Sequence, residues 1–129
     1  MSLTGEQAEE VYAFGEFLLD PAERVLSRGG EAVALTPKAF DTLLALVRNG
    51  GRLVEKARLL DEVWPDAFVE EKTLAQNIFL LRKTLGTDAA GEQYIRTVPR
   101  HGYRFVADVR VVRREDAARA SAAADKVVA

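Results

Sequence analysis

The sequence predicts an α+β domain, and three features of the chain support this fold class. Short β-type segments separated by turn residues fill residues 11–35, and helical patterns follow between residues 36 and 85. Two β-rich runs then complete the ordered part by about residue 112. Together these features predict an N-terminal four-stranded antiparallel sheet, three helices and a C-terminal β-hairpin.

The first part of the chain reads as a small antiparallel meander. Its four β-type segments are residues 12–14, 17–19, 24–27 and 32–35. Turn residues stand between them, namely Gly15, Asp20 with Pro21, and Gly29 with Gly30. Because such residues favour chain reversal, each segment is expected to pair with the next.

Start and stop signals delimit the first two helices. Thr36 and Pro37 supply a hydroxyl N-cap and a proline at the first helical position, and the glycines at 50–51 end the helix. Residues 52–54 can form a short bridging strand. A second helix over residues 56–63 stops before the Trp-Pro pair at 64–65.

The third helix is expected over residues 72–85, after a loop at 65–69. Its apolar residues recur every three or four positions, at Leu74, Ile78, Leu81 and Leu85. This period places them on one buried stripe and leaves four others facing away: Thr73, Gln76, Leu80 and Lys83.

A hairpin at residues 94–107 follows this helix. Tyr94 to Val98 gives one β-rich run, Tyr103 to Val109 a second, and residues 99–102 the turn. The hairpin carries Arg96, Arg100 and Arg104. A basic helix followed at once by a basic hairpin is typical of a winged helix, whose helix enters the DNA major groove while the wing lies on the backbone or in the minor groove.

Charge is unevenly distributed along the chain. The total is −2, yet residues 1–71 carry −7 and residues 72–104 carry +4. Since charges beyond roughly 8–10 Å are screened at physiological salt, the local basic patch matters more for phosphate binding than the total does. A solvated charged surface is the alternative interpretation.

Composition argues against an enzyme. The chain has one histidine, His101, and no cysteine, and neither glycine pair is followed by the lysine of a phosphate-binding loop. We therefore expect no catalytic residues, no metal site and no cofactor. With no apolar run near the roughly 20 residues of a membrane span and no signal peptide, we expect a cytoplasmic protein without membrane contact.

Four blocks in order make the sequence resemble the OmpR/PhoB-type winged-helix DNA-binding domain of bacterial transcription regulators. The blocks lie at residues 35–46, 59–65, 69–86 and 95–105. The wing sequence T-V-P-R-H-G-Y-R-F (97–105) resembles the CadC/ToxR-like variant, in which this domain comes first and a sensory region follows. The resemblance covers residues 11–112, with 1–10 expected to be a disordered leader and 113–129 an Ala-rich linker or tail.

The resemblance implies a function and a set of contacts. The expected partner is double-stranded DNA, bound sequence-specifically to control transcription by two copies arranged head to tail on a direct repeat. No receiver domain is expected before this domain, so the chain is expected to be part of a longer regulator. The candidate DNA-binding residues are Trp64, Lys72, Thr73, Gln76, Asn77, Leu80, Arg82, Lys83, Thr97, Arg100, Tyr103 and Arg104.

Several of these residues have a second interpretation. Gln76 and Asn77 suit adenine, but polar residues are common on exposed helix faces. Trp64 and Tyr103 either direct a polar group to phosphate or serve as half-buried core aromatics. Leu80 stands, like Phe79, where several family members have basic residues, so it either touches a thymine methyl group or packs against a partner.

The loop at residues 65–69 resembles the segment that stands near promoter-bound RNA polymerase in the family. Asp66 and Phe68 are the candidate polymerase contacts. The alternative is that Phe68 folds back onto Trp64 and Leu74. For the whole domain the competing function is a winged helix that binds protein and not DNA.

Overall fold

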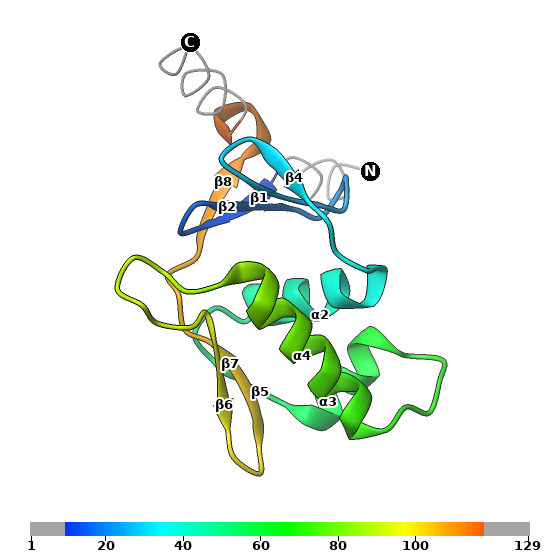
Figure 1. The fold of residues 1–129 in the computed structure, drawn as a ribbon. Helices are drawn as coiled ribbons and strands as arrows, with labels where there is room; N and C mark the ends of the chain where they lie inside the picture. The colour runs from blue at the N-terminus through cyan, green and yellow to red at the C-terminus, as the bar shows by residue number, and fades with distance from the viewer. Residues whose placement is uncertain (1–9, 118–129) are drawn as a thin grey trace. The chain divides into compact units, whose positions relative to one another are not determined.

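The computed structural model describes residues 10–117 and divides the chain into two compact units. One unit contains the strands before residue 35 together with the chain after residue 108, and the other comprises Leu35–Asp108. Figure 1 shows the first as a sheet, and the second as a group of helices with a hairpin beside them. The α+β fold class predicted from the sequence is confirmed.

The first unit is an antiparallel sheet with the strand order β4-β3-β2-β1-β8. Its strands are β1 (Glu10–Phe14), β2 (Phe17–Asp20), β3 (Val25–Arg28), β4 (Glu31–Val33) and β8 (Arg110–Arg113). The four predicted strands are present and pair in sequence order. Buried side chains alternate along β2, and the rings of Phe14 and Phe17 stack at 5.5 Å across the turn.

The fifth strand corrects the prediction for the end of the domain. The sequence suggested one β-rich run from Tyr103 to Val109, but the strand ends at Phe105, and the chain re-enters β structure only at Arg110. There it pairs with β1, placing Val112 opposite Val11. The return strand therefore belongs to the first sheet and closes its β1 edge.

An ion pair joins the end of β2 to the residue after β8. The Arg114 guanidinium donates two hydrogen bonds to the Asp20 carboxylate, one of them at 2.9 Å. Asp20 also accepts from the backbone amides of Ala22 and Glu23. Burial alone would raise the pKa of Asp20, but these hydrogen bonds and the Arg114 charge outweigh it, so the pKa lies below its usual value.

The second unit contains three helices: α2 (Pro37–Arg48), α3 (Lys56–Val63) and α4 (Glu71–Leu85). The predicted cap is confirmed, since the Thr36 hydroxyl accepts a hydrogen bond from the Ala39 amide at 3.2 Å. All three helices pack against one another through apolar faces, and α2 buries the longest run, from Thr42 to Val47.

A second sheet in this unit has the order β5-β7-β6, with β5 (Leu53–Glu55), β6 (Ile95–Val98) and β7 (Gly102–Phe105). The predicted bridging strand is thus present one residue later than expected. Gly102 faces Glu55 in the ladder, and a Cβ at this position would lie 2.9 Å from Glu55 Cα and closer still to the carbonyl oxygen of Val54. The strands approach too closely at this point for any residue but glycine.

The expected leader and tail lie mostly outside the described residues. Glu10, placed in the leader, already belongs to β1, and Arg113, placed in the tail, ends β8. Residues 114–117 are helical. No helix among residues 10–117 is long and apolar enough to cross a membrane.

Candidate nucleic-acid interface

The buried face of α4 is the one that the apolar period predicts, but on the opposite face Thr73 is half-buried and Phe79 is exposed. Leu74, Ile78, Leu81 and Leu85 are each no more than 1% exposed. The opposite face carries residues 76, 79, 80 and 83, spaced by three, one and three positions, and all four are exposed. Because positions three and four apart lie on one side of a helix, this outward stripe is a continuous surface.

Chemically, the outward stripe is mixed. Gln76 offers an amide, whereas Phe79 and Leu80 are 60% and 44% exposed. The Lys83 ammonium lies 5.4 Å from the centroid of the Phe79 ring, a cation–π contact one helical turn further on. The stripe therefore runs from a hydrogen-bonding group through an apolar pair to a cation.

Asn77 does not belong to this stripe, which corrects the prediction that it faces the groove. Its side chain is buried, and its amide donates a hydrogen bond to the Thr42 hydroxyl at 3.3 Å. Thr42 is itself buried in α2 and donates to the Lys38 carbonyl. Asn77 thus forms a polar contact between α2 and α4, which gives its buried amide the hydrogen-bond partner that buried polar groups need.

Arg82 also points elsewhere than predicted. Its guanidinium donates to the carbonyl oxygen of Ile95 at 3.1 Å and to the Thr97 hydroxyl at 2.7 Å. Both acceptors lie on β6, so Arg82 fixes the hairpin against α4. The Thr97 side chain, a predicted DNA contact, remains exposed, although its hydroxyl already accepts this bond.

The start of α4 carries acidic side chains that disfavour a bound phosphate. Glu70 and Glu71 flank its first turn, and no side chain caps the helix. Lys72 is exposed, with its ammonium 3.9 Å from the Glu70 carboxylate, and Thr73 is half-buried. Glu71 is held 3.2 Å from Lys56 of α3. A phosphate at this end must therefore compete with carboxylates.

The hairpin β6–β7 presents its arginines to solvent. Arg96 and Arg104 face each other in the ladder, and both are exposed. Within residues 10–117 no carboxylate pairs with Arg96, Arg100 or Arg104. Like charges directly opposite across a ladder repel each other, so this pair costs stability unless an anion binds it.

Arg96 was not among the residues predicted to bind DNA, and the register of the β6–β7 ladder is what places it opposite Arg104. Arg100 occupies the hairpin turn with a φ of 71°, a left-handed conformation that arginine adopts only at a cost. Tyr103 is 8% exposed and packs in the core, in keeping with its second interpretation.

Between α3 and α4 the loop projects an aromatic ring outward. Phe68 is fully exposed, so it does not fold back onto Trp64 and Leu74. Asp66 is exposed beside it, whereas Trp64 is half-buried at the end of α3. The structure thus contradicts the alternative in which Phe68 is a satellite of the core.

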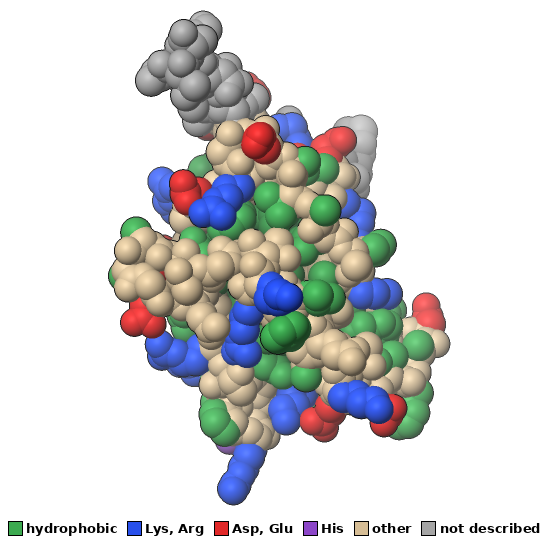
Figure 2. Space-filling model, in the orientation of Figure 1, with side chains coloured by type: hydrophobic (Ala, Val, Ile, Leu, Met, Phe, Trp, Pro, Cys, Tyr) green, Lys and Arg blue, Asp and Glu red, His purple; other side chains and the backbone are tan. Residues whose placement is uncertain are grey.

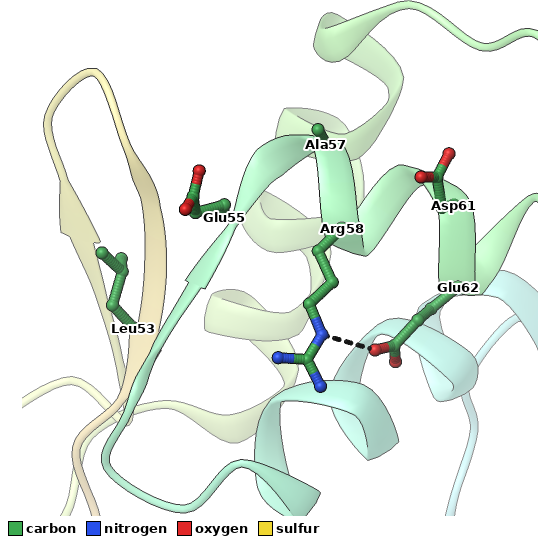
Figure 3. A pocket seen from close by; sticks show the side chains of 6 residues that line it. All are labelled: Leu53, Glu55, Ala57, Arg58, Asp61 and Glu62. Atoms are coloured by element: carbon green, nitrogen blue, oxygen red, sulfur yellow. Dashed lines mark hydrogen bonds and ion pairs between the residues drawn. The ribbon is translucent and has the colours of Figure 1, made fainter.

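A different surface lies between β5 and α3. Figure 3 shows a shallow pocket there, lined by Leu53, Glu55, Ala57, Arg58, Asp61 and Glu62. Its one arginine is neutralised, because Arg58 Nε donates to the Glu62 carboxylate at 3.0 Å. Glu55 and Asp61 add further negative charge, so this surface disfavours phosphate.

Figure 2 shows lysine and arginine side chains over α4 and the hairpin, with one at the hairpin tip, and hydrophobic side chains among them.

In the part of the chain that the structure describes, no group of three or more ligating side chains could hold a metal ion.

Known proteins match the chain along most of its length. Residues 30–105 match the family described as "Transcriptional regulatory protein, C terminal". This chain belongs to that family. The predicted resemblance is therefore confirmed.

Similar proteins include the transcriptional activator CadC of Escherichia coli K12, 32% identical over 102 residues, and the regulator HilA of Salmonella typhimurium LT2, 38% identical over 101 residues. Each match covers 78% of this chain but only 20% and 18% of the relative. The chain thus spans about a fifth of the length of these relatives.

Two solved structures show the same fold. The DNA-binding domain of E. coli CadC has a TM-score of 0.70 and 32% identity, covering 80% of this chain and 97% of the other. The RstA DNA-binding domain of Klebsiella pneumoniae, solved in complex with the RstA box, has a TM-score of 0.63 and 31% identity, covering 74% and 96%.

Proposed function

We propose that this chain binds double-stranded DNA sequence-specifically to regulate transcription in the cytoplasm. The outward stripe of α4 enters the major groove, and the hairpin β6–β7 lies on the backbone or in the adjacent minor groove. One observation supports this proposal above all. Arg96 and Arg104 lie opposite each other on the hairpin whose turn holds Arg100, and among the described residues none of the three pairs with a carboxylate. Three cations held apart from acids on an exposed ladder and turn form a surface for phosphates.

The contacts divide by role. Arg100, Arg104 and Arg96 hold phosphates or a narrow minor groove, and Lys83 reaches the backbone from the end of the stripe. Gln76 pairs with a base edge. Lys72 and Trp64 contribute at the flank, while Arg82, Asn77 and Tyr103 position the elements. No residue is assigned a catalytic role.

One unit of this size reads only a short half-site, so we propose that two copies bind a direct repeat head to tail. This arrangement predicts a site with two equal half-sites in the same orientation. Protection of a single half-site, or of an inverted pair, would contradict it.

The exposed loop supports a second contact, with RNA polymerase. Phe68 is fully exposed, and three acidic residues lie within three positions of it in the chain: Asp66, Glu70 beside Lys72, and Glu71 beside Lys56. Such a surface repels DNA and suits a basic protein. We expect Asp66→Ala and Phe68→Ala to leave DNA affinity unchanged while lowering transcription from the target promoter. Equal loss of both activities would place the loop in the fold or on the DNA.

The DNA proposal is tested by selecting bound duplexes from a random pool and titrating the recovered sequence over a salt series. Neutralising phosphates releases counterions, so the logarithm of the affinity should fall linearly with that of the salt concentration. A domain that binds only protein would recover no sequence and bind no duplex at any salt.

A further inference from the structure

The middle of the outward stripe is apolar where DNA offers few apolar groups. Phe79 and Leu80 are two of the five large hydrophobic side chains exposed among the described residues. They lie at adjacent positions on α4, between Gln76 and Lys83. A surface that contacts only phosphates would have no use for either side chain.

Only one base presents an apolar group in the major groove of unmodified DNA, namely the C5-methyl group of thymine. Gln76, one turn before Leu80 on the same stripe, carries the amide that pairs bidentately with adenine. An amide for adenine and an apolar pair for the methyl group of thymine are the two chemistries that distinguish an A·T pair from a G·C pair.

The cation–π contact holds the aromatic member in place. With the Lys83 ammonium against its ring, Phe79 has a preferred position on the helix surface, and the charge sits beside the apolar pair. Charge at the edge of the patch suits a duplex, whose phosphates rim the groove on both sides. The basic hairpin adds cations from the same unit. These charges favour DNA over an apolar protein surface as the occupant.

We propose that Phe79 and Leu80 are specificity-determining residues that contact thymine methyl groups in the major groove, next to an adenine read by Gln76. The proposal rests on the proposed DNA binding and narrows it to half-sites that contain A·T pairs.

Uracil provides the decisive probe, because it pairs as thymine does but lacks the methyl group. The recovered duplex is prepared with each thymidine replaced in turn by deoxyuridine, and the affinity of the wild-type protein for each duplex is measured. One or two positions per half-site should weaken binding by about fourfold each, the size expected from burying one methyl group. Leu80→Ala and Phe79→Ala should lower affinity for the thymine duplex and lose the uracil effect at the position each contacts.

Val111→Ala is the matched control, since Val111 is exposed on β8, outside the unit that carries α4. It should retain both affinity and uracil sensitivity. A wild type that binds the duplex without regard to uracil, a recovered site without thymine, or a uracil effect that survives in both variants would overturn the proposal while leaving DNA binding intact. Failure to bind any duplex would overturn the proposed function itself.

Discussion

Residues 53–71 and residues 72–104 follow each other in the chain and pack in the same unit, yet they carry opposite charge. The first segment holds a net −4 and the second a net +4. In the first, Arg58 and Lys56 are paired with Glu62 and Glu71. In the second, the hairpin arginines have no such partners among the described residues. Total charge is therefore a poor guide to what a small domain binds, whereas the pairing of each cation is informative.

Gly102 couples the two segments, and its replacement should have the largest effect. Gly102→Ala places a Cβ against the backbone of Val54 and Glu55, which cannot move without breaking the β5–β7 ladder. We expect a loss of about 4 kcal/mol or more in the free energy of unfolding, measured by urea titration. Gly50→Ala, whose Cβ would lie 3.6 Å from the nearest atom, is the control and should change stability little.

The two faces of α4 should respond differently to the same truncation. Leu81 is fully buried, so Leu81→Ala should destabilise the domain by about 2–5 kcal/mol. Leu80→Ala removes the same atoms from the exposed face and should alter stability by less than about 0.5 kcal/mol. Thermal unfolding of both variants tests this, and equal losses would show that the helix phase is wrong.

The stability of the domain should depend on pH through Asp20, a carboxylate that lies outside both segments. The pKa of Asp20 is lowered in the folded state, so its ion pair with Arg114 stabilises the protein above the unfolded pKa of about 3.9 and ceases to do so as pH falls through the folded pKa. Asp20→Asn should therefore cost about 1–3 kcal/mol at pH 7 and progressively less below about pH 4. Urea unfolding at several pH values measures this, and a difference that grows with acid would contradict the assignment.

No loss of stability is expected from a change at the hairpin tip. Arg100→Gly removes a cation and relieves a left-handed φ, so stability should stay constant or rise by up to about 1 kcal/mol. DNA affinity should nevertheless fall, and its salt slope should decrease by about one. Arg58→Ala, which removes an arginine already paired with Glu62, should change neither, and unchanged DNA binding by Arg100→Gly would exclude the tip from the interface.

Local signals in the sequence were enough to locate the three helices and their buried faces. The Thr36 cap, the glycine pair after α2 and the apolar period of α4 are each set by residues a few positions apart, so the chain itself reveals them. The stripe of Leu74, Ile78, Leu81 and Leu85 follows for the same reason.

What could not be predicted depends on partners far along the chain. Asn77 flanks the buried stripe, and only Thr42, 35 positions earlier, turns its amide inward. Arg82 looked like a DNA contact until the hairpin brought the carbonyl of Ile95 to it. The pairing of Val112 with Val11 joins opposite ends of the domain, so no local pattern could have assigned β8 to the first sheet.

Which surface meets DNA is tested most directly by following every backbone amide by NMR while the selected duplex is added. The signals of residues 72–85 and 95–105 should shift or broaden, with the largest changes near Gln76, Leu80 and Arg100, while those of residues 57–62 on α3 should stay in place. Changes gathered on α3 would contradict the proposed interface. An unchanged spectrum at saturating duplex would contradict DNA binding by this chain.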